Sequence, residues 1–202
     1  MKTKIISLVL AVASISGCGV AHPPMSRDEF LSTTRRDYAD ISPDQVFSAS
    51  EKLFRLADGN DFAISWTDDS VIANRSWSIY LVFAASFGTD YWIVKASPAN
   101  GATRVQATVG SAASPVFGMP TGGGGASATT LPGGVMPIQG TAIYEVFFAR
   151  LEYLLGKRSD WMSCQESNDR VKAGTVWGSN DALCNSFNMT DTDPTKPMAT
   201  SN

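Results

Sequence analysis

The sequence predicts an α+β fold: an antiparallel sheet of about four strands packed on a C-terminal helix, with a second helix before the sheet. Two helical patterns, residues 43–58 and 141–155, lie at the two ends of the central region. Between them, residues 62–109 contain apolar and alternating runs typical of strands. Two helices with wide apolar faces need a sheet to cover, so one α+β layer pair is the simplest arrangement.

The first helix has clear boundaries. Ser42 can cap it, Pro43 suits the first helical position, and Gln45 can complete a capping box. Gly59 is a suitable stop. The apolar residues between them recur at helical spacing and predict one buried face: Val46, Ala49, Leu53 and Ala57, with Phe47 and Phe54 beside it.

The strands are predicted from short apolar runs. Residues 62–66 form the first, and residues 70–87 contain one or two more. Residues 91–97 and 103–109 alternate around a turn with Asn100-Gly101 at its end, which predicts an antiparallel hairpin.

A Gly-rich segment, residues 118–134, separates these strands from the second helix. It offers few core residues, so we expect a flexible linker, with a lid or partner-binding loop as the alternative. The second helix should bury Phe147 and Leu151, which lie mid-helix on its apolar face, and should end at Gly156. Residues 42–158 therefore form the predicted domain.

Cys164 and Cys184 are an even pair outside any redox motif. In an exported protein such a pair predicts a disulfide, with two unpaired thiols as the alternative. Residues 159–202 are thus expected to form a bridged C-terminal segment followed by a disordered tail rich in Thr, Asp and Pro.

Composition argues against several functions. The net charge is −3, which gives no electrostatic reason to bind nucleic acid. The single histidine, His22, lies near the N-terminus, and no cluster suggests a metal site or a cofactor. We expect no catalytic residue. A hydrolase using carboxylates such as Asp61, Asp90 or Glu145 is the least favoured alternative.

Aromatic residues gather in the predicted strands. Core and cross-strand packing is their ordinary use. The alternative is an apolar groove between sheet and helix that admits a lipid tail or small ligand. Its candidate lining is Trp66, Trp77, Trp92 and Phe147.

The N-terminus carries a secretory pattern. Lys2 and Lys4 precede an apolar run, residues 5–15, that is too short to cross a membrane. Ile15-Ser16-Gly17-Cys18 resembles the lipobox of bacterial lipoproteins. The resemblance implies that residues 1–17 are removed and that Cys18 carries acyl chains such as palmitate, which anchor the protein stably.

The residue after the cysteine is Gly19, which favours the periplasmic face of the outer membrane over retention at the inner membrane. Residues 18–41 are short of core residues and are expected to form a tether from the lipid to the domain.

The lipobox and the helix–sheet–helix order over Ser42 to Gly156 together resemble small outer-membrane lipoproteins with a helix-grip domain, as in the BamC subunit of the barrel-assembly machinery. The resemblance implies a non-catalytic accessory or scaffold subunit that docks on an envelope protein partner in a membrane-associated complex. The alternative is a periplasmic domain that binds lipid or a small ligand.

Overall fold

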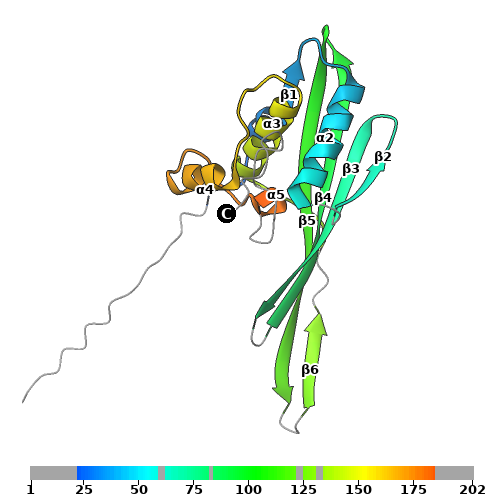
Figure 1. Cartoon of the computed structure of the whole chain (residues 1–202). Coiled ribbons are helices and arrows are strands. Elements are labelled where there is room, and N and C mark those ends of the chain that lie inside the picture. The colour runs from blue at the N-terminus through cyan, green and yellow to red at the C-terminus, as the bar shows by residue number, and fades with distance from the viewer. Residues whose placement is uncertain (1–21, 59–61, 82–83, 122–124, 131–133, 185–202) are drawn as a thin grey trace, which may run out of the picture.

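The computed structural model describes residues 22–58, 62–81, 84–121, 125–130 and 134–184 (Figure 1). The predicted signal peptide, Cys18 and the predicted tail from residue 185 lie outside these residues. The elements are α1 (Arg27–Thr34), β1 (Arg35–Tyr38), α2 (Pro43–Asp58), β2 (Phe62–Trp66), β3 (Ser70–Leu81), β4 (Ala84–Ala99), β5 (Ala102–Thr121), β6 (Gly125–Thr130), β7 (Met136–Pro137), α3 (Ala142–Leu154), α4 (Cys164–Lys172) and α5 (Asp181–Cys184).

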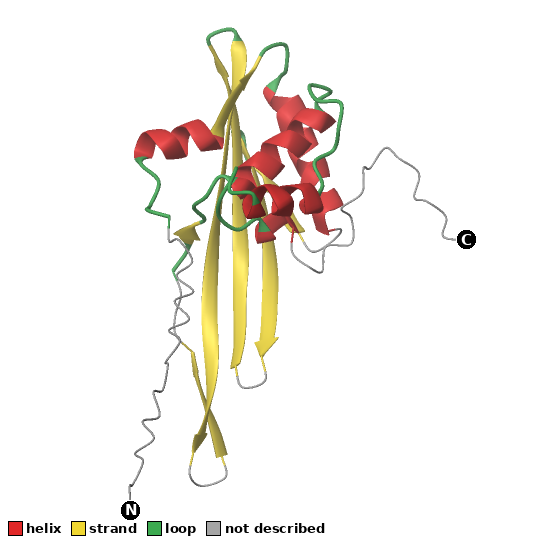
Figure 2. Cartoon of the chain, turned by 90° about the vertical axis from the view of Figure 1, so that its left-hand side faces the viewer, coloured by secondary structure: helices red, strands yellow, loops and turns green. Residues whose placement is uncertain are grey.

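The strands form one antiparallel sheet, which confirms the α+β class. The order is β1-β5-β4-β3-β2, and β6 and β7 also pair with β5. The sheet is larger than the four strands predicted. Strand β1 comes from the predicted tether, β6 from the predicted Gly-rich linker, and β7 from the residues just after that linker. Figure 2 shows most of the helices gathered on one side of the sheet, with its lower half extending past them.

The predicted hairpin is confirmed as β4–β5. Ala99 pairs with Ala102, which leaves a two-residue turn of Asn100 and Gly101. Both turn residues have positive φ, 50° and 79°. An Asn-Gly turn adopts this conformation at low cost, and its twist matches that of the strands.

Helix α2 has the predicted capping box. The Ser42 amide donates to Oε1 of Gln45 at 2.8 Å, and the Gln45 amide donates to Oγ of Ser42 at 3.3 Å. Its apolar face is buried: Val46, Leu53, Phe54 and Ala57 are fully inaccessible. The helix packs on β3 and β4 beside α3.

Helix α3 lies at the centre of the core. Phe147 and Leu151 are fully buried, as predicted. The Phe147 ring stacks on Trp92 of β4 with centroids 5.1 Å apart. Phe54 of α2 approaches both rings, at 6.1 Å and 5.5 Å. These aromatic contacts join the two helices to the sheet.

Residues 27–38 depart from the predicted tether. They form α1 and then β1, which pairs with β5 over Arg35 to Tyr38. Arg104 of β5 donates two hydrogen bonds to Asp37 at 2.9 Å and 2.8 Å, and these bonds lower the pKa of the Asp37 carboxyl. A polar strand such as β1 has no hydrophobic alternation, and its pairing depends on an available edge of β5.

The Gly-rich segment also differs from the linker prediction within its described residues. Strand β5 continues to Thr121 and β6 pairs with it over residues 125–130. Residues 122–124 and 131–133 lie outside the described part of the chain. Backbone pairing suffices to form these strands, and small side chains give little sequence signal of it.

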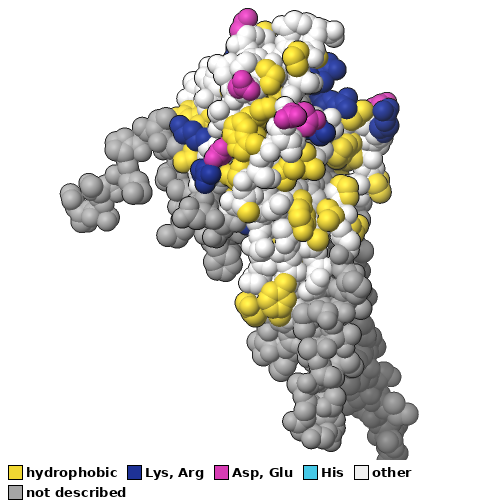
Figure 3. All heavy atoms as spheres, turned by 90° about the vertical axis from the view of Figure 1, so that its right-hand side faces the viewer, with side chains coloured by type: hydrophobic (Ala, Val, Ile, Leu, Met, Phe, Trp, Pro, Cys, Tyr) yellow, Lys and Arg dark blue, Asp and Glu magenta, His cyan; other side chains and the backbone are white. Residues whose placement is uncertain are grey.

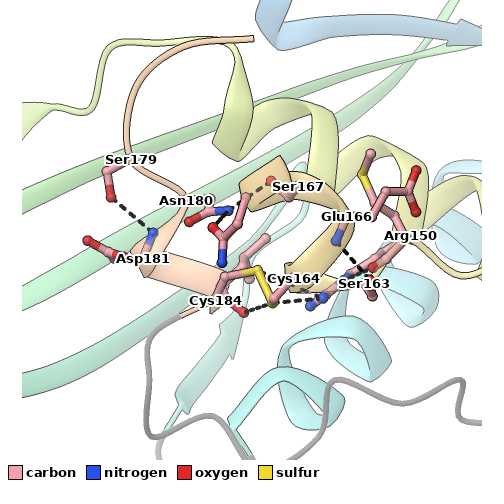
Figure 4. The surroundings of a disulfide bond; sticks show 12 residues. Arg150, Ser163, Cys164, Glu166, Ser167, Ser179, Asn180, Asp181 and Cys184 are labelled. Carbon is pink, nitrogen blue, oxygen red and sulfur yellow. Dashed lines mark hydrogen bonds between the residues drawn. A yellow bond between two sulfur atoms is a disulfide. The ribbon is translucent and has the colours of Figure 1, made fainter. Parts of the chain in front are cut away.

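The predicted disulfide joins Cys164, the first residue of α4, to Cys184, the last of α5 (Figure 4). Beside it, the buried Arg150 of α3 donates from Nε to the carbonyl of Met162 at 3.0 Å and lies 4.8 Å from the Trp161 ring. The bridged segment is therefore docked on α3.

We predict that removing the bridge lowers stability substantially. The replacement Cys164→Ala combined with Cys184→Ala should cost about 3 kcal/mol, because the bridge closes a loop of roughly twenty residues and limits the unfolded chain. Urea unfolding with and without reductant measures this. Reduced wild type should unfold near the midpoint of the double variant. Two thiols that alkylate without reductant, or equal midpoints for all forms, would contradict the prediction.

Beyond the helices the sheet narrows to a projection that we call the arm. It comprises residues 76–81 of β3, 84–89 of β4, 111–121 of β5, and β6. Figures 1 and 2 show the arm extending past the helical part of the molecule, which we call the body.

Candidate functional site: a cleft at the base of the arm

A cleft of about 700 Å³ lies where the arm leaves the body. One wall is the helix-bearing face of the sheet and the other is the bridged C-terminal segment. Its lining is mixed polar and apolar: Arg75, Trp77, Ser78, Ile79, Asp90, Ser111, Ile138, Asn168, Ser179, Asp181, Ala182 and Cys184.

A buried ion pair forms the floor. Arg75 of β3 and Asp90 of β4 are register partners, so their side chains leave the sheet on the same face. The guanidinium donates to Oδ2 of Asp90 at 3.1 Å, and the two side chains are only 3% and 7% exposed. Arg75 also donates to the carbonyl of Asp181 at 3.1 Å, which ties the sheet to α5.

Trp77 extends this network toward the arm. Its indole Nε1 donates to the second oxygen of Asp90, Oδ1, at 3.1 Å. The ring lies over Gly88, where an added Cβ would be 2.2 Å from the indole and 2.6 Å from the Ala112 carbonyl oxygen. Only glycine leaves room for the Trp77 ring at this position.

The network fixes the position of the Asp90 carboxylate, because both of its oxygens accept hydrogen bonds from neighbouring side chains. His22 is absent from the lining and stacks on Trp177 at 4.6 Å. The cleft can accommodate a small amphipathic group against Trp77 and Ile79.

The structure does not bring the four predicted groove residues together. Trp92 and Phe147 are fully buried and stacked in the core. Trp66 is 47% exposed on β2, where its indole donates to Glu51 at 2.9 Å. Trp77 alone of the four lines the cleft.

The pairing of Arg75 with Asp90 was not predicted from the sequence, although the strand positions of the two residues indicate it. Arg75 follows Val71 and Ala73 in the inward phase of β3, and Asp90 precedes Trp92 in the inward phase of β4. Opposite charges at inward positions of neighbouring strands predict a buried pair.

Within the described residues, no group of three His, Cys, Asp or Glu side chains is placed to hold a metal ion. None of the described helices is long and apolar enough to cross a membrane.

Comparison with known proteins identifies no relative. No protein-family model matches the chain, and neither curated proteins nor solved structures give a match. The likeness to helix-grip lipoproteins therefore remains a prediction.

Proposed function

We propose that this chain is a non-catalytic lipoprotein of the cell envelope, anchored by acyl chains on Cys18, facing the periplasm from the outer membrane. In this role it is an accessory or scaffold subunit of a membrane-associated complex. The anchor supplies the location, and the body and arm supply surfaces for an envelope protein partner.

The proposal rests mainly on the short separation in sequence between Cys18 and the first residues that contact the body. His22 stacks on Trp177 at 4.6 Å, and the Met25 amide donates to Oε1 of Gln139 at 3.0 Å. The segment from Cys18 to His22 spans at most about 14 Å even when fully extended. An acylated Cys18 would therefore hold this side of the body close to the lipid surface.

The disulfide supports an exported protein. Bridges between cysteines form and persist in oxidising compartments such as the periplasm, and this one joins two short helices of the docked C-terminal segment. A bridge so placed agrees with the export signal read at the N-terminus.

Metabolic labelling with a fatty-acid analogue tests the anchor. Wild type should carry the label and fractionate with membranes, because two or more acyl chains bind a bilayer stably. Cys18→Ala should lose the label. The control, Cys164→Ala with Cys184→Ala, keeps Cys18 and should retain it. An unlabelled wild type would refute the proposal.

The cleft favours a second candidate function, binding of a lipid or small ligand. Its volume of about 700 Å³ and its Trp77 and Ile79 walls suit an amphipathic molecule. Native mass spectrometry of protein taken from the periplasm separates the two functions. A stoichiometric bound molecule lost on Trp77→Ala would favour binding over scaffolding.

A further inference from the structure

The arm is built from two stretches of sequence that contain no charged residue. Residues 76–89 supply its β3 and β4 parts, and residues 105–144 include its β5 and β6 parts. Neither stretch contains Asp, Glu, Lys, Arg or His. In the whole chain, Asp, Glu, Lys and Arg together make up 17% of the residues. The charge-free segments include the whole arm, and the second one also extends into the body on both sides of it.

Both faces of the arm expose apolar side chains. Ile79 is 53% exposed on the face that carries Trp77, and Tyr80 and Phe87 are 73% and 41% exposed on the other. Figure 3 shows one side of the molecule, on which charged side chains lie over the body and hydrophobic ones continue below them. A strand face open to water is normally polar. A protein partner docked on one face would leave the other uncovered, whereas lipid can surround both.

The placement of the anchor near the arm rests on the proposed function. The first described residues lie near the base of the arm, because Met25 donates to Gln139 and the nearby Met136 pairs with Ser111. An anchor at most about 14 Å from His22 is therefore near this base. The strand from Ser111 to Thr121 spans about 33 Å, so the arm extends beyond the reach of the anchor. Two more apolar side chains are exposed at the base of the arm: Val135 is 59% exposed and Met136 is 72% exposed. A strand of about 9–11 residues is long enough to cross the hydrocarbon of a bilayer. The β5 part of the arm has this length, whereas the parts from β3, β4 and β6 are shorter and enter it only part of the way.

The two edge strands of the arm, as far as the structure describes it, have unpaired backbone groups, and these limit how the arm can enter lipid. Strand β2 pairs with β3 only as far as Arg75, so residues 76–81 form an edge within the described sheet, and β6 forms the other. Unpaired backbone groups are strongly disfavoured in hydrocarbon. A neighbouring copy can supply the missing partner, with the β3 edge of one copy against the β6 edge of the next, a head-to-tail contact.

We propose that the arm inserts into a lipid bilayer, where copies of the chain pair along their arm edges. The inserted protein is then attached to the membrane both by its acyl chains and by the arm. Insertion is driven by apolar burial, so it depends little on lipid charge or on salt.

A polarity-sensitive dye on Ser78→Cys reports the environment of the arm, and the same dye on Ser48→Cys of α2 is the matched control on the body. Both serines are exposed. The acylated protein is placed in vesicles of phosphatidylethanolamine and phosphatidylglycerol, and a Cys18→Ser form is mixed with vesicles of phosphatidylcholine. The arm dye should brighten and be quenched by spin-labelled lipid tails in both, whereas the control dye should stay accessible to aqueous iodide.

Lysine substitutions test the apolar faces. Ile79→Lys and Tyr80→Lys should each weaken vesicle binding of the Cys18→Ser form at least about tenfold, because a charge on a lipid-facing strand position is costly. Ile93→Lys, at a position 38% exposed on the body, should leave binding unchanged. Chemical crosslinking on vesicles should give oligomers that both arm variants reduce.

The outcomes separate this proposal from the anchor. An unlabelled Cys18 together with an arm dye that enters lipid would refute the anchor and support insertion. An arm dye that stays accessible to iodide in vesicles holding the acylated protein would overturn insertion. Oligomers that form through the arm in the absence of lipid would show that it is a protein interface. Crosslinking that yields only monomers on vesicles would overturn the edge pairing.

Discussion

Replacement of Phe147 by alanine is expected to destabilise the protein by about 3–5 kcal/mol. The ring is fully buried and meets Trp92, Phe54 and Phe148 with centroids 5.1–6.1 Å apart. Truncation leaves a cavity between two helices and the sheet, and three aromatic rings cannot close it without moving the backbone. The free energy of unfolding is measured in urea with the disulfide intact.

Phe87→Ala is the matched control. Phe87 is 41% exposed on the arm and contacts Tyr80 in the same ribbon. Its removal should leave the urea midpoint of the body almost unchanged, because the arm adds nothing to the core between α2, α3 and the sheet. Equal losses in the two variants would mean that arm and body unfold as one unit. An unchanged midpoint for Phe147→Ala would contradict the packing described.

Helices α2 and α3 and the central hairpin were predictable because their signals are local. Ser42 and Gln45 cap α2 through contacts three residues apart, and Asn100-Gly101 determines its own turn. The helix-facing side chains of α3 recur at a spacing that needs no knowledge of the sheet. In each case the sequence signal lies within the residues that form the element.

The added strands were not predictable in the same way. Strand β1 is Arg-Arg-Asp-Tyr, and β6 is built of Gly, Ala, Ser and Thr. Neither has an apolar alternation, and each depends on an edge of β5 that only the folded sheet provides. The absence of charge in residues 105–144 was visible, but its coincidence with residues 76–89 required the sheet register.

The candidate site illustrates the same limit. The Trp residues of the strands look alike in the sequence, but they differ in the fold: Trp92 points into the core, whereas Trp77 lines the cleft. Asp90 was read as one of several carboxylates, and its pairing with Arg75 follows from the register of β3 and β4. Side chains at equivalent strand positions differ in role because the helices cover only part of the sheet.

Asp90→Ala is expected to cost about 3–5 kcal/mol, because it leaves a buried guanidinium without its carboxylate. Both residues of the pair are buried. The variant also removes the acceptor of the Trp77 indole. The urea midpoint should fall, and Trp77, at the base of the arm, should become more accessible to aqueous quenchers. A midpoint within error of wild type would show that water reaches the pair freely.

Two further variants show that the loss comes from the unpaired charge. Arg75→Met with Asp90→Leu removes both charges at similar volume, so it should recover most of the stability lost in Asp90→Ala. Asp37→Ala breaks the Asp37–Arg104 pair, whose side chains are 47% and 42% exposed. It should change stability little, because water solvates the remaining guanidinium. If the double variant is as unstable as Asp90→Ala, the cleft needs the hydrogen bonds of the pair, including the link from Arg75 to the carbonyl of Asp181. Recovery in the double variant would instead show that apolar packing alone can hold the base of the arm together.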